Sequence, residues 1–137
     1  MKPWTPPAPG DIVWCHFPHL PRRSPGPKPR PGLVCQVTEY EDGVAVTVVY
    51  GTSQGLARMY EGEFAVTKQG APAAYLAAGL SFDTKFDFRQ SVELPWNDAF
   101  FAVPPRAPFG QHPKMGVLHP SLMRAAAAAA RAARREG

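Results

Sequence analysis

The alternation of apolar and polar side chains predicts a chain of short β-strands. Successive residues of a strand point to opposite faces, so β-branched or aromatic residues at every second position are typical of a half-buried strand. The segments with this character are Asp11 to Phe17, Gly32 to Tyr40, Val44 to Tyr50 and Glu63 to Lys68, with one or two further strands between Ser81 and Pro95.

Turns and loops separate these strands. Pro18 to Pro31 is rich in proline and in Lys/Arg, and proline lacks the amide donor that regular structure needs, so this segment is expected to be a long basic loop. Glu41-Asp42-Gly43 predicts a tight turn that joins the second and third strands as a hairpin. Gly51 to Tyr60 is expected to be a loop, and Trp96 to Pro113 an aromatic, proline-containing insertion without clear periodicity.

Two segments favour helices. Pro72 to Gly79 has proline near its start and glycine after its end, which are the usual boundary residues of a short helix. Pro120 to Arg135 begins with proline and contains the alanine run Ala125 to Ala130, the residue with the highest helix propensity. Short strands with one terminal helix and no βαβ rhythm predict a mainly β fold, either a small barrel or a half-open sheet.

The length of the chain indicates a single domain covering residues 1–137. Within it we expect a β core over residues 10–95, the insertion over 96–113 and the terminal helix over 120–135. No apolar run reaches the roughly 20 residues of a membrane-spanning helix, and the proline-rich start does not resemble a signal peptide. A cytoplasmic protein without membrane contact is therefore expected.

The sequence contains no paired spacing of cysteines or histidines that is typical of a metal site, so we expect no metal and no other cofactor. The two cysteines, Cys15 and Cys35, are expected to be buried thiols rather than a disulfide framework.

Positive charge is concentrated at the two ends of the chain. The formal net charge is +4, but residues 1–30 carry five basic and one acidic residue, and residues 104–137 carry six basic and one acidic residue. Residues 31–103 carry four basic and nine acidic residues. This asymmetry favours an anionic partner such as nucleic acid. Solvation of exposed loops and of a helix end is the alternative explanation.

Five segments, in order, resemble the MazF/PemK (Kid-like) toxin family. They are Gly10-Asp11-Ile12-Val13-Trp14, Lys28-Pro29-Arg30-Pro31-Gly32-Leu33-Val34, Thr52-Ser53-Gln54 after Val48-Val49-Tyr50, Lys85-Phe86-Asp87 through Ser91-Val92-Glu93, and Met115-Gly116-Val117-Leu118. They resemble the family's first strand, the exit of its long first loop, the end of its third strand, its R-C-D-Q-x-R-T-V-D segment, and the residues before its last helix.

This resemblance implies an SH3-like β-barrel, a homodimer, metal-independent cleavage of single-stranded RNA, and neutralisation by a cognate antitoxin. The chain departs from the family at Gln90-Ser91, where arginine and threonine are usual, and in the insertion Trp96 to Pro113. These departures favour the alternative function, which is a non-catalytic module on the same barrel that binds RNA or inhibits a protein partner. Fold alone does not decide between the two.

Metal-free RNA cleavage needs a base for the 2′-hydroxyl proton, a cation or acid for the phosphorane and leaving oxygen, and donors that orient the phosphate. The candidates are Asp87 as base, Arg30 as phosphate clamp, Lys85 as cation or acid, and Thr52 and Ser53 as hydroxyl donors. A planar guanidinium suits the clamp because it bonds phosphate oxygens in pairs.

Each candidate also has a structural explanation. The alternation from Lys85 to Arg89 places Lys85, Asp87 and Arg89 on one face and the two phenylalanines between them on the other, which is also the pattern of an exposed salt-bridging strand. Arg30 alone is a solvated loop charge, and Thr52-Ser53 alone is a turn.

Further residues are candidates for RNA binding. They are Arg22, Arg23, Lys28, His16, His19 and Arg89. Aromatic residues near the loops are candidates for base stacking or, more simply, for core packing: Trp14, Phe17, Tyr50, Tyr60, Trp96, Phe100 and Phe101. Trp96, Phe100 and Phe101 are also candidates for covering an apolar groove, and Leu118, Leu122 and Met123 are expected to be exposed at a dimer interface.

Overall fold

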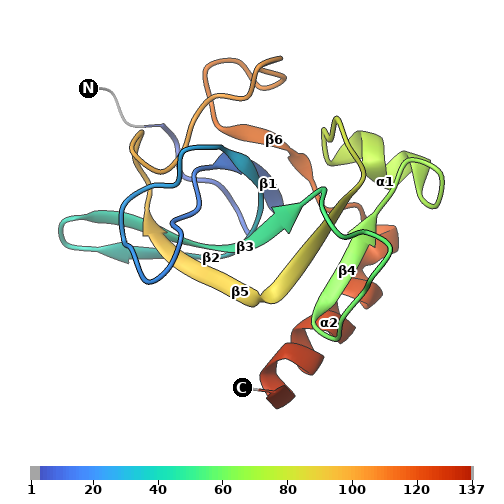
Figure 1. Ribbon diagram of the computed structural model, residues 1–137. Helices are drawn as coiled ribbons and strands as arrows, with labels where there is room; N and C mark the ends of the chain where they lie inside the picture. The colour runs from blue at the N-terminus through green and yellow to red at the C-terminus, as the bar shows by residue number, and fades with distance from the viewer. Residues whose placement is uncertain (1–3, 137) are drawn as a thin grey trace.

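The computed structural model describes residues 4–136, which form a sheet with helices at one side (Figure 1). Residues 1–3 and 137 of the predicted domain lie outside the described residues. The elements in chain order are β1 (Asp11–Cys15), β2 (Arg30–Tyr40), β3 (Gly43–Thr52), β4 (Glu63–Val66), α1 (Pro72–Ala77), β5 (Thr84–Pro95), β6 (Lys114–Val117), the 3₁₀ helix η1 (Pro120–Leu122) and α2 (Met123–Glu136).

All six strands belong to one antiparallel sheet in the order β4-β5-β3-β2-β1-β6. The prediction of a mainly β fold with a terminal helix is therefore confirmed. β4 and β6 lie at opposite edges of the sheet, and the sheet is not closed between them. The stretch from Ser81 to Pro95 contains one strand, β5, which begins at Thr84.

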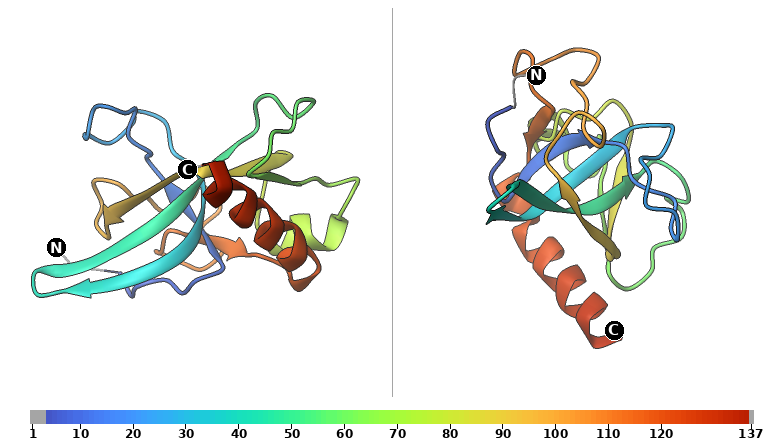
Figure 2. Two further views of the ribbon diagram at one scale, coloured as in Figure 1. Left: turned by 90° about the horizontal axis from the view of Figure 1, so that it is seen from below. Right: turned by 90° about the vertical axis from the view of Figure 1, so that its left-hand side faces the viewer.

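The predicted hairpin joins β2 to β3 and extends away from the rest of the sheet (Figure 2). Tyr40 pairs with Gly43, whose φ of 141° lies in the left-handed region that favours glycine. β2 begins at Arg30, two residues earlier than predicted, because Pro31 and Arg30 continue the pairing with Trp14 and Cys15 of β1. Proline is tolerated there, near the start of a strand.

Irregular pairing bends the sheet. In β2 the pairing of Val34 is followed by that of Gln36, so Cys35 is an extra residue in a β-bulge. In β5 the pairing with β3 passes directly from Ser91 to Asp87, so residues 88–90 bulge out of the ladder. The strong bend of β5 is visible in Figure 1.

Both faces of the sheet carry apolar clusters because side chains alternate along each strand. On one face, Ile12 of β1 packs with residues of β4, β5, α1 and α2. On the other face, Val13 and Cys15 pack with Phe17, Trp96 and residues of the central strands. The first strand is therefore buried on both sides, which explains its nearly continuous apolar sequence.

The helices cover the first of these faces. α2 packs Ala126, Ala129 and Ala132 inward, three and six residues apart as helical geometry requires. α1 ends at Ala77, and Gly79 follows with a φ of 70°. A side chain at Gly79 would collide with the Met115 carbonyl of β6, so this glycine permits the close approach of the two segments.

Several predictions about individual elements are corrected. β1 ends at Cys15 rather than Phe17, β4 ends at Val66 rather than Lys68, and α2 is preceded by a 3₁₀ turn. The segment Lys114–Val117 is an edge strand that the periodicity did not indicate, because it is only four residues long. Cys35, expected to be buried, is exposed because it occupies the bulge in β2, whereas Cys15 is buried as expected.

Two expectations about exposed apolar residues are also wrong. Trp96 and Phe101 of the insertion do not cover an outer groove, because both are buried in the second cluster, where their rings lie 4.6 Å apart. Leu118 and Leu122 are partly buried against the first cluster, and of the three residues proposed for the dimer interface only Met123 is exposed. Across residues 4–136, no helix has both the length and the apolar character to cross a membrane.

Candidate functional site

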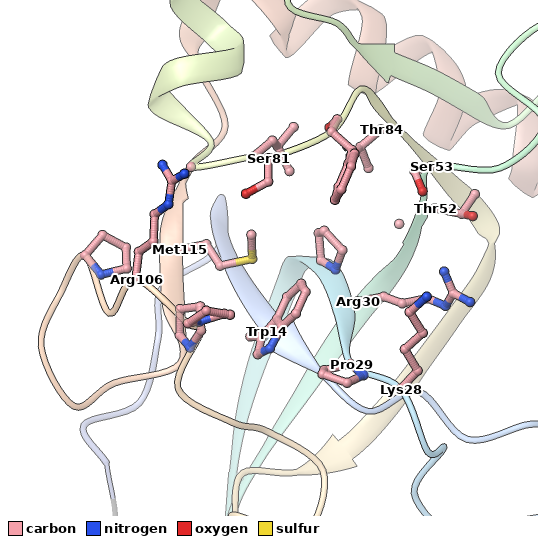
Figure 3. Close-up of a pocket in the computed structure, with 18 of the residues that line it drawn as sticks. Trp14, Lys28, Pro29, Arg30, Thr52, Ser53, Ser81, Thr84, Arg106 and Met115 are labelled. Atoms are coloured by element: carbon pink, nitrogen blue, oxygen red, sulfur yellow. The ribbon is translucent and has the colours of Figure 1, made fainter.

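A cleft of about 530 Å³ opens on the side of the sheet where α1 lies (Figure 3). Six separate segments contribute to it: β1, the end of the basic loop with the start of β2, the end of β3, the stretch from α1 to β5, the insertion, and β6. The residues that line it are Trp14, Lys28, Pro29, Arg30, Pro31, Gly51, Thr52, Ser53, Leu76, Gly79, Leu80, Ser81, Phe82, Thr84, Pro104, Pro105, Arg106, Pro108 and Met115.

The floor of the cleft is formed by Trp14 and Met115. Trp14 shares a strand face with Ile12, and its ring is only partly buried because it lies beyond the last pairing between β1 and β6. Met115 is passed over in that pairing, since Ile12 pairs with Gly116 and Val13 with Lys114. The floor is therefore an aromatic ring beside a thioether, two groups that accept a flat ligand ring.

Three cations line the cleft: Lys28, Arg30 and Arg106. None of its lining residues is acidic. The Arg30 guanidinium lies 5.9 Å from the centre of the Tyr50 ring, and within residues 4–136 it forms no ion pair. Because neutralising carboxylates are absent from the lining, the cleft favours an anionic ligand.

Hydroxyl groups line the upper part of the cleft in Figure 3: Thr52, Ser53, Ser81 and Thr84. The Thr52 hydroxyl accepts a hydrogen bond from the Gln54 amide at 3.1 Å and the Thr84 hydroxyl donates to the Phe82 carbonyl at 2.8 Å. The turn expected for Thr52-Ser53 is therefore present, and Thr52 is also one of the residues that line the cleft.

Lys85 is buried beside the cleft rather than in its lining. Its ammonium donates to the Gly55 carbonyl at 3.0 Å, to the Arg58 carbonyl at 2.8 Å and to Glu63 Oε1 at 3.0 Å. These acceptors match the three hydrogens of the ammonium. Lys85 thus closes the loop between β3 and β4, and it reaches a ligand in the cleft only if one of these bonds is exchanged.

Asp87 is buried as well and holds the bulge of β5 together. Its Oδ1 accepts hydrogen bonds from the Arg89 amide at 2.9 Å and from Arg89 Nε at 3.3 Å, and its Oδ2 accepts one from Gln90 Nε2 at 3.0 Å. Gln90, where the sequence departs from the family pattern, is therefore a direct partner of the proposed base. Asp87 is not among the residues that line the cleft.

The alternation predicted for β5 is confirmed. Lys85 and Arg89 both lie over the Tyr60 ring, each 5.5 Å from its centre, while Phe86 and Phe88 stack on Phe64 on the other face. The exposed salt-bridging face expected as the alternative is only half right: Lys85 pairs with Glu63 and Asp87 pairs with Arg89, but Lys85 and Asp87 are buried.

The remaining predicted RNA-binding residues lie outside the cleft lining, apart from Lys28. Arg22 and Arg23 are exposed on the basic loop. His16 is half-buried, and its Nδ1 lies 2.8 Å from the Gly26 carbonyl, so it ties the middle of the loop to the residue that follows β1. His19 is exposed at the start of the same loop.

Sequence reasoning did not identify several residues that line the cleft, among them Arg106, Ser81, Phe82 and Met115. They have no shared motif and come from segments that meet only in the folded chain. Trp14 was one of seven aromatic residues proposed for stacking, and it is the one of these that lines the cleft. No group of three or more histidine, cysteine or acidic side chains placed to hold a metal ion occurs within residues 4–136.

Comparison with protein-family models finds no match for this chain, and comparison with curated proteins finds none either.

Proposed function

We propose that the protein binds single-stranded RNA in the cleft that contains Arg30. The observation that carries this proposal is the composition of the cleft, in which a partly exposed tryptophan lies between cationic side chains and no acidic side chain is present. Proteins that hold single-stranded nucleic acid combine these two features, because aromatic rings stack on bases and cations attract the backbone.

The recessed position of Trp14 favours an unpaired base over a duplex. Its ring lies on the floor of the cleft with Met115, so a base must leave its own stack to reach it. The hydroxyls of Ser53 and Ser81 provide donors and acceptors that suit phosphate and ribose oxygens. Single-stranded RNA therefore fits the cleft better than double-stranded nucleic acid does.

Cleavage of the bound RNA is a second proposed function, favoured by one observation. Arg30 and Thr52, which the resemblance to the MazF/PemK family assigns to phosphate clamping and hydroxyl donation, line the same cleft. In the expected reaction the ribose 2′-oxygen bonds to phosphorus, the bond to the 5′-oxygen breaks, and the products are a cyclic phosphate and a 5′-hydroxyl. The 2′-hydroxyl proton passes to a base and the leaving oxygen receives a proton.

The proposed roles of Asp87 and Lys85 in this reaction require a rearrangement. Asp87 is buried and both of its oxygens are engaged by Arg89 and Gln90, while all three hydrogens of the Lys85 ammonium are donated to Glu63 and two carbonyls. Release of the Gln90 bond on RNA binding would free one Asp87 oxygen as the base. Without such a change the two residues position β5 and the neighbouring loop, and the protein is a binding module.

The remaining proposals rest on the family resemblance. We propose that the bent sheet is a member of the SH3-like barrels, that the protein forms a homodimer, and that a cognate antitoxin neutralises it. A cytoplasmic location belongs to the same proposal. The bulges of β2 and β5 support the barrel proposal because they curve the sheet.

The test measures RNA binding by fluorescence anisotropy with a labelled, unstructured oligoribonucleotide. Arg30→Ala should weaken binding about tenfold or more, because a charge-assisted contact to phosphate is lost. Arg131→Ala is the control, since Arg131 is an exposed arginine on α2 outside the cleft lining. Equal effects of the two substitutions, or no binding by the native protein, would overturn the proposal.

Cleavage is tested separately, with a long unstructured RNA in the presence of EDTA. The cleavage proposal expects shortened RNA with cyclic phosphate ends and none with Arg30→Ala. Binding without shortening would support the non-catalytic RNA-binding module. Absence of RNA binding together with capture of a folded protein partner by the cleft would instead support the protein-inhibitor alternative.

A further inference from the structure

We propose that Arg106 makes a second phosphate contact across the cleft from Arg30, so that the ligand is an RNA segment with at least two phosphates rather than a mononucleotide. This inference rests on the proposed RNA-binding function and adds a residue of the insertion to the site. Figure 3 shows Arg30 and Arg106 at opposite sides of the cleft, with Trp14 and Met115 between them.

The placement of the two arginines matches the chemistry of a polynucleotide. A base stacked on Trp14 has one phosphate on its 5′ side and one on its 3′ side, and the cleft has a guanidinium on either side of that ring. Guanidinium groups bond phosphate oxygens in pairs, so each arginine suits one phosphate. A mononucleotide would leave one of the two arginines without an anionic partner.

Arg106 is available for such a contact. It is exposed, and in the part of the chain that the structure describes its side chain forms no ion pair or hydrogen bond. The next lysine or arginine along the chain, Lys114, differs in this respect because its ammonium lies 3.5 Å from the Asp11 carboxylate. Arg106 therefore remains a cation that a ligand can neutralise.

The backbone around Arg106 is held in an unusual conformation. Ala107 has a φ of 43°, and it is the single non-glycine residue with positive φ among residues 4–136. Its amide donates to the Pro104 carbonyl at 2.9 Å, which closes a turn containing Pro105 and Arg106. A positive φ is strained for alanine, and such strain is often found where a loop is shaped for binding.

The insertion that carries this turn is fastened to the sheet. Phe101 forms a β-bridge with Cys15, and the Ala102 amide donates to the Trp14 carbonyl at 3.1 Å. The backbone of Trp14, on the floor of the cleft, is thus hydrogen-bonded directly to the insertion, which forms one wall of the cleft. Prolines 104, 105 and 108 further restrict the segment. Arg106 consequently extends from a defined wall, and fewer conformations are lost when it binds a ligand.

The experiment compares labelled oligouridylates that contain one or several internal phosphates, and measures their affinity over a range of salt concentrations. Neutralising one phosphate of a single strand contributes about 0.7 to the slope of log affinity against log salt concentration. Arg106→Ala should weaken binding of the longer oligonucleotide about tenfold and reduce the magnitude of this slope by about 0.7. Arg106→Lys should retain the slope because the charge is kept.

The single-phosphate oligonucleotide should bind more weakly and respond much less to Arg106→Ala than to Arg30→Ala. Arg131→Ala is the control, since Arg131 is exposed on α2 and lies outside the cleft. An unchanged affinity and slope in Arg106→Ala, while Arg30→Ala lowers both, would overturn this inference and leave the RNA-binding function intact. No binding of any oligonucleotide by the native protein would overturn both. Thermal unfolding of each variant checks that the fold is retained.

Discussion

The Lys85 ammonium lies 3.0 Å from the Glu63 carboxylate, and both side chains are almost fully buried, with exposed fractions of 7% and 5%. The pair joins β5 to the edge strand β4, and the Gly55 and Arg58 carbonyls accept the other two hydrogens of the ammonium. A buried ion pair whose ammonium has all three hydrogens bonded stabilises a particular arrangement of the chain, here the loop that follows Thr52.

Replacing Lys85 with methionine should destabilise the protein by about 3–5 kcal/mol, because the Glu63 carboxylate would remain buried without its counter-ion. The measurement is urea unfolding at pH 7. The double variant Lys85→Met with Glu63→Gln should recover part of this loss. If Lys85→Met instead unfolds like the native protein but no longer acts on RNA, Lys85 is a functional cation rather than a structural one.

Asp87→Asn tests whether the carboxylate is structural or chemical. If the carboxylate only holds the β5 bulge in place, Asp87→Asn should lower the free energy of unfolding by about 1–3 kcal/mol. The reason is that the amide group cannot accept all the hydrogen bonds that Arg89 and Gln90 now donate. If the carboxylate is instead the general base, Asp87→Asn should slow cleavage by about 10²–10⁴-fold while RNA affinity is retained. Unfolding curves, anisotropy and cleavage rates on one preparation separate these outcomes.

RNA binding should quench the fluorescence of Trp14, because a stacked base is an efficient quencher and this ring forms the floor of the cleft. Trp14→Phe should remove the quenching. It should weaken binding by less than the roughly 1–3 kcal/mol that complete loss of a stacking ring costs, since phenylalanine keeps part of the stacking surface. Trp96→Phe is the control, because Trp96 is buried on the other face of the sheet. Quenching that survives in Trp14→Phe would place the bases elsewhere.

Gly51→Ala should disturb the part of the cleft that is lined by the end of β3. A side chain at this position would collide with the Pro31 carbonyl and approach the Phe86 ring to 2.8 Å, so β3 would have to separate from the start of β2. We expect a loss of about 1–3 kcal/mol in stability and weaker RNA binding. Gly43→Ala is the control: at the tip of the β2–β3 hairpin its new side chain meets no atom within 4 Å but is strained by the φ of 141°, so stability should fall while RNA affinity is unchanged.

The raised pKa values of the two cysteine thiols predict that the free energy of unfolding falls at alkaline pH. Although part of Cys35 is exposed, desolvation of its thiol raises its pKa from 9.0 to about 11, and burial raises the pKa of Cys15 further. The unfolded chain therefore ionises first, so the contribution of the neutral thiols to stability is complete below pH 9 and is lost as the pH rises toward 11. Cys35→Ser should reduce this fall in urea unfolding between pH 8 and 11. An unchanged pH profile in Cys35→Ser would contradict the assignment.

The sequence was sufficient to predict most of the strands, the hairpin and the terminal helix, because each depends on contacts close in the chain. Alternation placed Lys85 and Asp87 opposite Phe86, and the Glu41-Asp42-Gly43 turn located the hairpin. The short edge strand Lys114–Val117 was missed, since four residues contain too little periodicity and its pairing with β1 is a distant contact.

The composition of the cleft was decided only by the tertiary structure. Arg30 and Thr52 were predicted as site residues and do line it, but Arg106 and Met115 join them through sheet pairing and loop packing that no local pattern encodes. Whether a charged residue faces a ligand or a neighbouring loop depends on what the fold places beside it. For Lys85 the fold supplies the Glu63 carboxylate and two backbone carbonyls. A residue predicted as a site residue because of its charge is therefore buried and holds a neighbouring loop in place.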